Sequence, residues 1–203
     1  MKRILVYLIG LNLLAIGIVI NISSGLGVAA LSSSIYTTSE IFNLTLGTSS
    51  IIWYLLFVVI QCILSKKITL EFLMEIPLSF IFGLLNDFYA SFIIIKPQSW
   101  VQSLILLCIA IICISLGVYL TSKTNIVLNP GDGIVQTISQ ISQKQFSLIK
   151  NIFDISMIIC SVALSILTRS PFYGIGIGTI ISALMIGRGI NLWEKIFNKK
   201  YIL

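Results

Sequence analysis

The residues best suited to chemistry in this sequence form a short polar segment, Asn129-Pro130-Gly131-Asp132-Gly133, between two long apolar runs. Asn129 is a favoured helix N-cap, Pro130 suits the first helical position, and Asp132 sits where the acid of a capping box reaches back. The segment predicts a short helix that runs to about Gln143. A helix start offers free N–H groups and a positive dipole end, which favour an anionic solute. Asp132 favours a proton or a cation instead, or acts as a cap, and these alternatives stay open.

A related segment, Ser24-Gly25-Leu26-Gly27, lies about one hundred residues earlier and leads into a second short helix that ends near Phe42. Two half-helices that enter the membrane from opposite sides would bring their first turns together near its midplane. The alternative is that each helix lies flat on the membrane surface. On the first interpretation, the predicted solute-binding residues are those at the two helix starts: Gly25, Gly27, Asn129, Gly131, Asp132 and Gly133.

Ionisable side chains inside apolar segments are the other candidates, because a charge within a membrane is costly and usually functional. They predict two further charged site residues, Asp87 and Asp154. Asp154 follows Lys150 by four residues, so an ion pair at the membrane surface is the competing interpretation. Glu71 and Glu75 lie one helical turn apart, beside a lysine, and are expected to be solvated.

Several kinds of site are excluded by what the sequence lacks. It contains no histidine, and its four cysteines are scattered through apolar runs without a C-x-x-C spacing. We therefore expect neither a metal nor another cofactor. No H-E-x-x-H, G-x-S-x-G or phosphate-loop motif occurs, so we do not expect an enzyme.

Composition identifies the elements that must position these residues. Hydrophobic residues make up 57% of the 203 residues and charged residues 10%, against roughly 45–50% and about 25% in soluble domains. The mean hydropathy is +1.06, and so small a soluble protein could not hide this much apolar surface. The sequence therefore predicts an all-α polytopic membrane protein whose partner is the lipid bilayer, and it excludes a nucleic-acid-binding module.

Six apolar runs predict six transmembrane helices, since a helix needs about 20 residues to cross a hydrocarbon core about 30 Å thick. The runs are Ile4–Ile20, Ile51–Leu64, Ile76–Ile95, Val101–Leu120, Ile155–Leu167 and Phe172–Ile190. The second and fifth lengthen to about Thr48–Leu64 and Phe146–Thr168 if flanking polar residues join the helix.

The positive charges predict the orientation in a bacterial cytoplasmic membrane. With six spans and a cytoplasmic N-terminus, only Lys96 and Arg169 of the 13 Lys and Arg residues fall outside. This bias fits the positive-inside rule and places the C-terminus in the cytoplasm as well. Arg188 is expected to be an anchor at the inner membrane surface, as are Lys199 and Lys200.

The halves of the chain, residues 1–95 and 96–203, resemble each other at an offset of about one hundred residues. Residues Ile76–Phe88, for example, align with Ile177–Gly189 without a gap. Three spans in each half turn the second half upside down relative to the first. The predicted fold is therefore one membrane domain of two inverted three-helix repeats, each with a short re-entrant or interfacial half-helix.

The segment Leu128–Val135 and the three-plus-three arrangement of apolar runs resemble bacterial YczE/YitT-type integral membrane proteins. The resemblance covers essentially the whole chain. It is nearer to the YczE-like branch, since no soluble C-terminal domain follows. The first-half segment departs from the family pattern, because Val28 and Ala30 stand where Pro and Asp are expected. The resemblance implies this architecture and a transport-like role, without a substrate.

Together these features predict a small transporter or permease-like protein with a polar solute site where the two half-helices meet. The alternative is a membrane partner subunit, either the substrate-binding component of a larger transporter or a regulatory or immunity protein. The sequence leaves open the solute, which the helix starts suggest is anionic, and whether the protein forms a homodimer.

Overall fold

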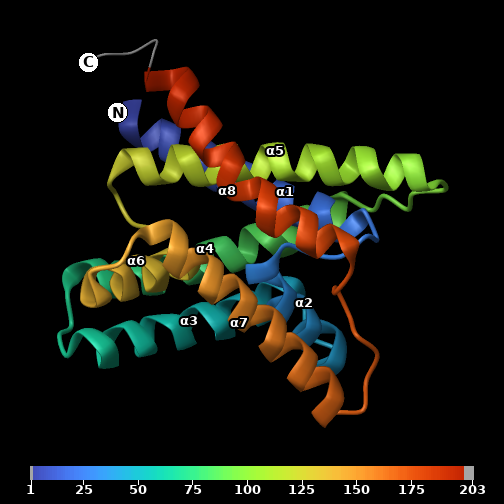
Figure 1. Ribbon diagram of the computed structural model, residues 1–203, viewed down its shortest axis with the longest axis horizontal. Helices are drawn as coiled ribbons and strands as arrows, with labels where there is room; N and C mark the ends of the chain where they lie inside the picture. The colour runs from blue at the N-terminus through green and yellow to red at the C-terminus, as the bar shows by residue number, and fades with distance from the viewer. Residues whose placement is uncertain (1, 199–203) are drawn as a thin grey trace.

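The computed structural model describes residues 2–198, which form eight α-helices joined by short connections (Figure 1). Two of the helices are short, and these are α2 (Ala30–Phe42) and α6 (Pro130–Ser142). The six long helices are α1 (Lys2–Ser23), α3 (Leu46–Ser65), α4 (Leu70–Phe92), α5 (Trp100–Thr124), α7 (Phe146–Leu167) and α8 (Ile177–Asn198). Lys199 and Lys200, the expected membrane anchors, lie outside the described residues.

Five of the long helices, α1, α3, α4, α5 and α7, are long and apolar enough to cross a membrane. Their outward faces expose large apolar side chains such as Ile63, Leu84 and Leu167, which suit contact with lipid and not with water. These features support a polytopic membrane protein. Helix α8 does not meet the same test of length and composition, because its second half carries Arg188 and Glu194.

The expected span Phe172–Ile190 is wrong at its start, since α8 begins only at Ile177. The residues before it form a loop that rests on the connection between α1 and α2. There the N–H of Val28 donates to the carbonyl oxygen of Gly174 at 2.7 Å. Gly174 has a φ of +68°, a conformation that costs glycine little. Pairing with another segment has replaced the first helical turn that the apolar run predicted.

Helices α1 and α5 pack against each other in antiparallel orientation, with glycines at the contact. A Cβ atom at Gly117 would lie 2.8 Å from both the carbonyl oxygen of Gly10 and the backbone nitrogen of Leu14, so the two backbones touch, as small residues allow between membrane helices. Gly17 packs in the same way against Ile114. The two contacts correspond at an offset of one hundred residues, since Gly17 matches Gly117 and Ile114 matches Leu14.

We expect Gly117→Ala to destabilise the protein by about 1–3 kcal/mol, the usual cost of overpacking a tight contact. The added methyl group meets backbone atoms, which cannot rotate away. The thermal unfolding midpoint of the detergent-solubilised protein measures the effect. Gly187→Ala in α8 is the matched control, because no atom lies within 4 Å of an added Cβ there. Equal midpoints for the two variants would contradict the close packing of α1 on α5.

Each short helix packs on a long helix of the other half of the chain, again at matched positions. The hydroxyl groups of Thr37 in α2 and Ser161 in α7 are hydrogen-bonded at 2.5 Å. The hydroxyl group of Thr137 in α6 donates to Oε1 of Gln61 in α3 at 3.1 Å. Thr137 lies one hundred residues after Thr37, and Ser161 lies one hundred residues after Gln61.

Both short helices begin inside the bundle and end at its surface. The residues before their first turns, Ala29 and Asn129, are buried, whereas the residues that end them, Asn43 and Gln143, are exposed. The predicted start of α6 at Asn129 and its predicted end near Gln143 are confirmed. The first turns of the two helices therefore share the interior of the molecule.

The last helices of the two halves are arranged differently. Helix α4 packs along α3, whereas α8 lies apart from α7 and touches it only slightly (Figure 1). Instead, α8 lies against α5. Helices α3 and α4 are thus in close contact along the first half, whereas α7 and α8 are separated in the second.

Candidate functional site

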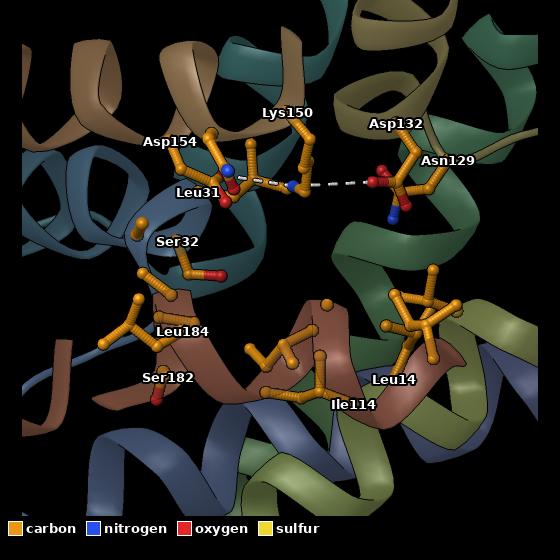
Figure 2. A pocket seen from close by; sticks show the side chains of 18 of the residues that line it. Leu14, Leu31, Ser32, Ile114, Asn129, Asp132, Lys150, Asp154, Ser182 and Leu184 are labelled. Carbon is orange, nitrogen blue, oxygen red and sulfur yellow. Dashed lines mark hydrogen bonds and ion pairs between the residues drawn. The ribbon is translucent and has the colours of Figure 1, made fainter. Parts of the chain in front are cut away.

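A cavity of about 360 Å³ occupies the space between α7 and α8, where both short helices begin (Figure 2). One wall is polar and consists of Ala29–Ser32 at the start of α2, Asn129 and Asp132 at the start of α6, and Lys150 and Asp154 on α7. The opposite wall, called the apolar wall below, comes from α1, α5 and α8 and is mostly apolar, with Leu14, Ile114 and Leu184. Helix α8 also adds the polar residues Ser182, Arg188 and Asn191 to the lining. A cavity of this size suits a small solute.

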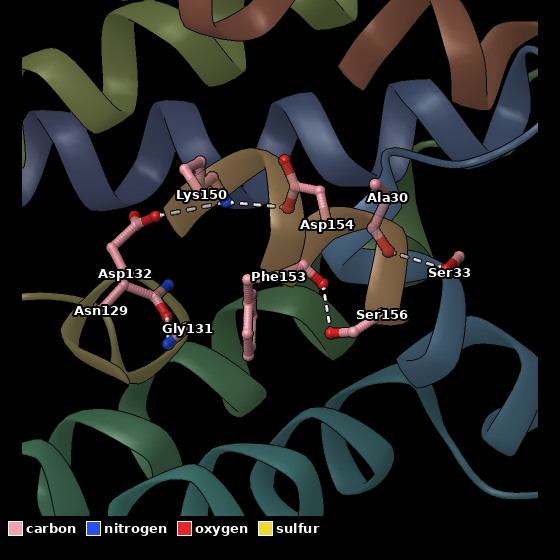
Figure 3. Close-up of polar contacts among 9 residues, drawn as sticks. All are labelled: Ala30, Ser33, Asn129, Gly131, Asp132, Lys150, Phe153, Asp154 and Ser156. Atoms are coloured by element: carbon pink, nitrogen blue, oxygen red, sulfur yellow. Dashed lines mark hydrogen bonds and ion pairs between the residues drawn. The ribbon is translucent and has the colours of Figure 1, made fainter. Parts of the chain in front are cut away.

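Three charged side chains meet on the polar wall. The Nζ atom of Lys150 lies 3.1 Å from Oδ1 of Asp154 and 3.6 Å from Oδ1 of Asp132 (Figure 3). Both aspartates are 8% exposed. Two carboxylates thus share one ammonium group in surroundings that screen charge poorly. The group is held together by the lysine, since each carboxylate would otherwise be buried without a partner.

Local sequence explains how these groups are presented. Lys150 and Asp154 lie one turn apart on the same face of α7. Asp132 is held in the first turn of α6, whose start is fixed by Pro130 and by Asn129, whose side-chain oxygen accepts the N–H of Gly131 at 3.1 Å. The Asn129 cap is thus confirmed. The carboxylate of Asp132 points to Lys150 and not back to the backbone of Asn129 (Figure 3), so the capping-box interpretation is wrong.

The start of α2 differs electrostatically from that of α6. Ala29, at its N-cap position, makes no side-chain hydrogen bond, and the first turn holds no acidic residue. The hydroxyl group of Ser32 points into the cavity (Figure 2). The N–H of Ala29 donates to Oδ1 of Asn21 at 2.6 Å. No acidic residue of its own first turn compensates the positive end of α2, whereas α6 has its own cap and its own carboxylate. Of the two helix starts, that of α2 is the one suited to an anion.

The predicted glycines shape the structure around the cavity and do not line it. Gly25 and Gly27 form the turn before α2 with φ values of +69° and +116°, which few other residues adopt. Gly131 lies against Leu31. Gly133 lies behind the polar wall and faces α3 and α4. Of the residues predicted at the helix starts, Asn129 and Asp132 reach the cavity.

Of the two predicted charged residues, Asp154 lines the cavity and Asp87 does not. The carboxylate of Asp87 accepts the N–H of Gly47 at 2.6 Å and the hydroxyl group of Thr45 at 2.8 Å. The carboxylate therefore provides a hydrogen-bond acceptor for a free N–H group at the start of α3 and stabilises the positive end of that helix. This contact joins residues forty positions apart, which the local pattern around Asp87 did not indicate.

Sequence reasoning missed one feature of the interior. Arg188, predicted as an anchor at the membrane surface, is exposed and also contributes to the lining of the cavity. Glu75 was expected to be solvated, and this is wrong, since it is 3% exposed. Its Oε2 accepts a hydrogen bond from Nε2 of Gln61 at 2.7 Å. The only local signal was the position of Glu75 beside the apolar run that begins at Ile76.

The chemistry available in the cavity is binding and proton exchange. In the part of the chain that the structure describes, no group of three or more His, Cys, Asp or Glu side chains could hold a metal ion. The polar wall offers an ammonium group, two carboxylates, a hydroxyl group and a helix start. The apolar wall offers a surface for the hydrocarbon part of a solute.

The fold and the cavity define a polytopic α-helical membrane protein with an interior site of solute size. The chain belongs to a family of unknown function, DUF6198, which matches residues 1–195. It is similar to the uncharacterized protein YyaS of Bacillus subtilis (strain 168), at 24% identity over 200 residues that cover 97% of this chain and 94% of that protein. No solved structure matches. These matches show this family and a bacterial relative, and the assignment to YczE/YitT-type proteins stays a prediction.

Proposed function

We propose that this protein is a small transporter or permease-like protein that binds a solute with an anionic group and an apolar body. The observation that carries the proposal is the meeting of both short-helix starts at one cavity with a charged wall and an apolar wall. Irregular backbone and buried charge are costly in a membrane and persist where they line a pathway or a site. A purely structural protein would have no need for them.

The anionic group of the solute binds at the start of α2 in this proposal. The free N–H groups of the first turn and the hydroxyl group of Ser32 supply donors, and the helix dipole supplies favourable charge. Lys150 lies on the same polar wall, with its charge shared between two aspartates. The apolar body of the solute packs on Leu14, Ile114 and Leu184, where it loses contact with water.

The proposed architecture is two inverted repeats, residues 1–95 and 96–203, with α8 as the sixth span. Its support is the recurrence of the α1–α5 and short-helix contacts at an offset of one hundred residues. The buried starts and exposed ends of α2 and α6 favour re-entrant half-helices over flat ones. The YczE-like branch and the location of both termini in the cytoplasm belong to the same proposal.

Cysteine accessibility measures this topology. Of the segment Ser23–Thr45, the exposed end at Asn43, Leu44 and Thr45 should react, as single cysteines, with a membrane-impermeant reagent added outside intact cells, as should Lys96–Trp100. Cysteines at Lys66, Lys67 and Lys123 should react only after the membrane is opened, since positive charges favour the cytoplasmic side. Labelling of Lys123→Cys from outside would contradict the six-span arrangement.

Uptake into proteoliposomes tests the function. Vesicles with the purified protein should accumulate a member of a panel of labelled carboxylates that empty vesicles exclude. Ser32→Leu, which fills the polar wall, should abolish this uptake, whereas Ser91→Leu at the exposed end of α4 should not. If no labelled solute enters and a second protein co-purifies, the alternative of a membrane partner subunit takes the place of the transporter.

A further inference from the structure

Glu75 forms a second buried polar site, separate from the walls of the cavity. Its carboxylate lies between α4, α3 and α6 and accepts Nε2 of Gln61 at 2.7 Å. Oε1 of Gln61 in turn accepts the hydroxyl group of Thr137 at 3.1 Å. A hydrogen-bonded chain therefore runs from α4 through α3 to α6. The counterpart of Gln61 in the other half is Ser161, which bonds directly to Thr37, and no carboxylate takes part there.

The surroundings of Glu75 contain no positive charge to balance it. The titratable groups near enough to interact electrostatically with its carboxyl group are Tyr7 of α1, Glu71 of α4 and Asp132 of α6. On α3, the group in contact is the uncharged amide of Gln61. Among the described residues, no lysine or arginine nitrogen lies within 4 Å of it. A buried carboxylate without a cation is costly, whereas a neutral carboxylic acid is not.

Gly133 connects this carboxyl group to the cavity. A Cβ atom at Gly133 would collide with the carboxyl group of Glu75 and lie 3.1 Å from Oε1 of Gln61. Both side chains therefore pack directly against the backbone of the first turn of α6. The preceding residue in that turn is Asp132, which pairs with Lys150 in the cavity.

We propose that Glu75 is a proton-binding site that controls the position of the first turn of α6. In the neutral acid, Oε1 carries the proton and Oε2 accepts the amide of Gln61. Release of the proton to water leaves a carboxylate against Gly133 and near Asp132, and the repulsion moves this turn and with it the contact between Asp132 and Lys150. Proton binding stands without the proposed function; the further step, that it drives solute movement, rests on that function.

Infrared difference spectroscopy of the purified full-length protein in phosphatidylcholine vesicles tests proton binding without any solute. We expect a protonated carboxylic acid band that disappears as the pH rises, is lost in Glu75→Gln and is kept in Glu71→Gln, its exposed neighbour one turn away. Glu75→Asp is the control for misfolding, because it keeps a carboxyl group. A shifted band in this variant would show that loss of the band in Glu75→Gln reflects loss of the carboxyl group and not of the fold. An unchanged band in Glu75→Gln, or a band that responds to sodium at constant pH, overturns the proposal.

The coupling to the cavity is tested with Ser32→Cys in a background whose four native cysteines are serines. The rate at which a methanethiosulfonate reagent modifies this cysteine is measured at each pH with and without Glu75→Gln, because ionisation of the thiol itself makes both rates depend on pH. The ratio of the two rates should change over the range in which the carboxyl band titrates. A ratio that stays constant with pH overturns the coupling. Failure of solute uptake with both of these results intact would count against the proposed transport and not against the proton site.

Discussion

Lys150→Met is expected to lower the free energy of unfolding by about 3–5 kcal/mol, the usual cost of removing one partner from a buried ion pair. Methionine keeps most of the length of the apolar stem, so the loss arises from charge. Asp132 and Asp154, both 8% exposed, would then face each other with no cation between them. Chemical unfolding of the detergent-solubilised protein, followed by circular dichroism, measures the change.

Two controls isolate the charge effect in that experiment. Lys123→Met removes a lysine from an ion pair of similar length, 3.1 Å to Glu194, whose side chains are 45% and 49% exposed. Because exposed pairs contribute about 0–1 kcal/mol, this variant should stay near the wild type. Asp132→Asn and Asp154→Asn together should restore most of the stability of Lys150→Met. Equal losses for the two lysine variants would show that the three charges on the polar wall do not depend on one another.

The starts of the short helices could be predicted from sequence because the signals for them are local. An N-cap, a proline at the first position and an amphipathic stretch act within a few residues, so Asn129 and Pro130 mark the start of α6 without knowledge of the rest of the fold. The pairing of Lys150 with Asp154 was accessible for the same reason, since it requires one turn of one helix.

The third member of the charged group could not be derived in this way. Asp132 contacts Lys150 across eighteen residues and two helices, and nothing near either residue specifies the distance. Glu75 shows the same limit. A membrane helix is apolar on all sides, so its hydrophobic pattern does not reveal which face is inside. Only the packing of α4 on α3 and α1, with the Glu75 side chain against Gly133 of α6, shows that Glu75 is buried while Glu71 is exposed.

Asp132→Asn is expected to reduce solute uptake at least about tenfold, a loss of about 1.4 kcal/mol, while the expressed level stays near that of the wild type. Lys150 keeps Asp154 as a partner at 3.1 Å, so the change leaves no unpaired buried cation. It removes the charge that holds Lys150 toward α6. Lys150 would then pair with Asp154 alone, and the polar wall would lose one of the two carboxylate charges that the solute meets. Proteoliposome uptake and protein yield are the two measurements.

Two further variants separate this site role from a role in helix stability. Asn129→Ala removes the N-cap and should cost about 1 kcal/mol of stability, so it should lower the yield or the unfolding midpoint before it lowers the uptake per folded molecule. Asp132→Glu keeps the charge but adds a methylene group, which displaces the carboxylate from Lys150, so it should rescue uptake poorly. Full uptake by Asp132→Asn would reduce this residue to a stabiliser of the first turn of α6. The function of the cavity would then depend on Asp154, Lys150 and the start of α2.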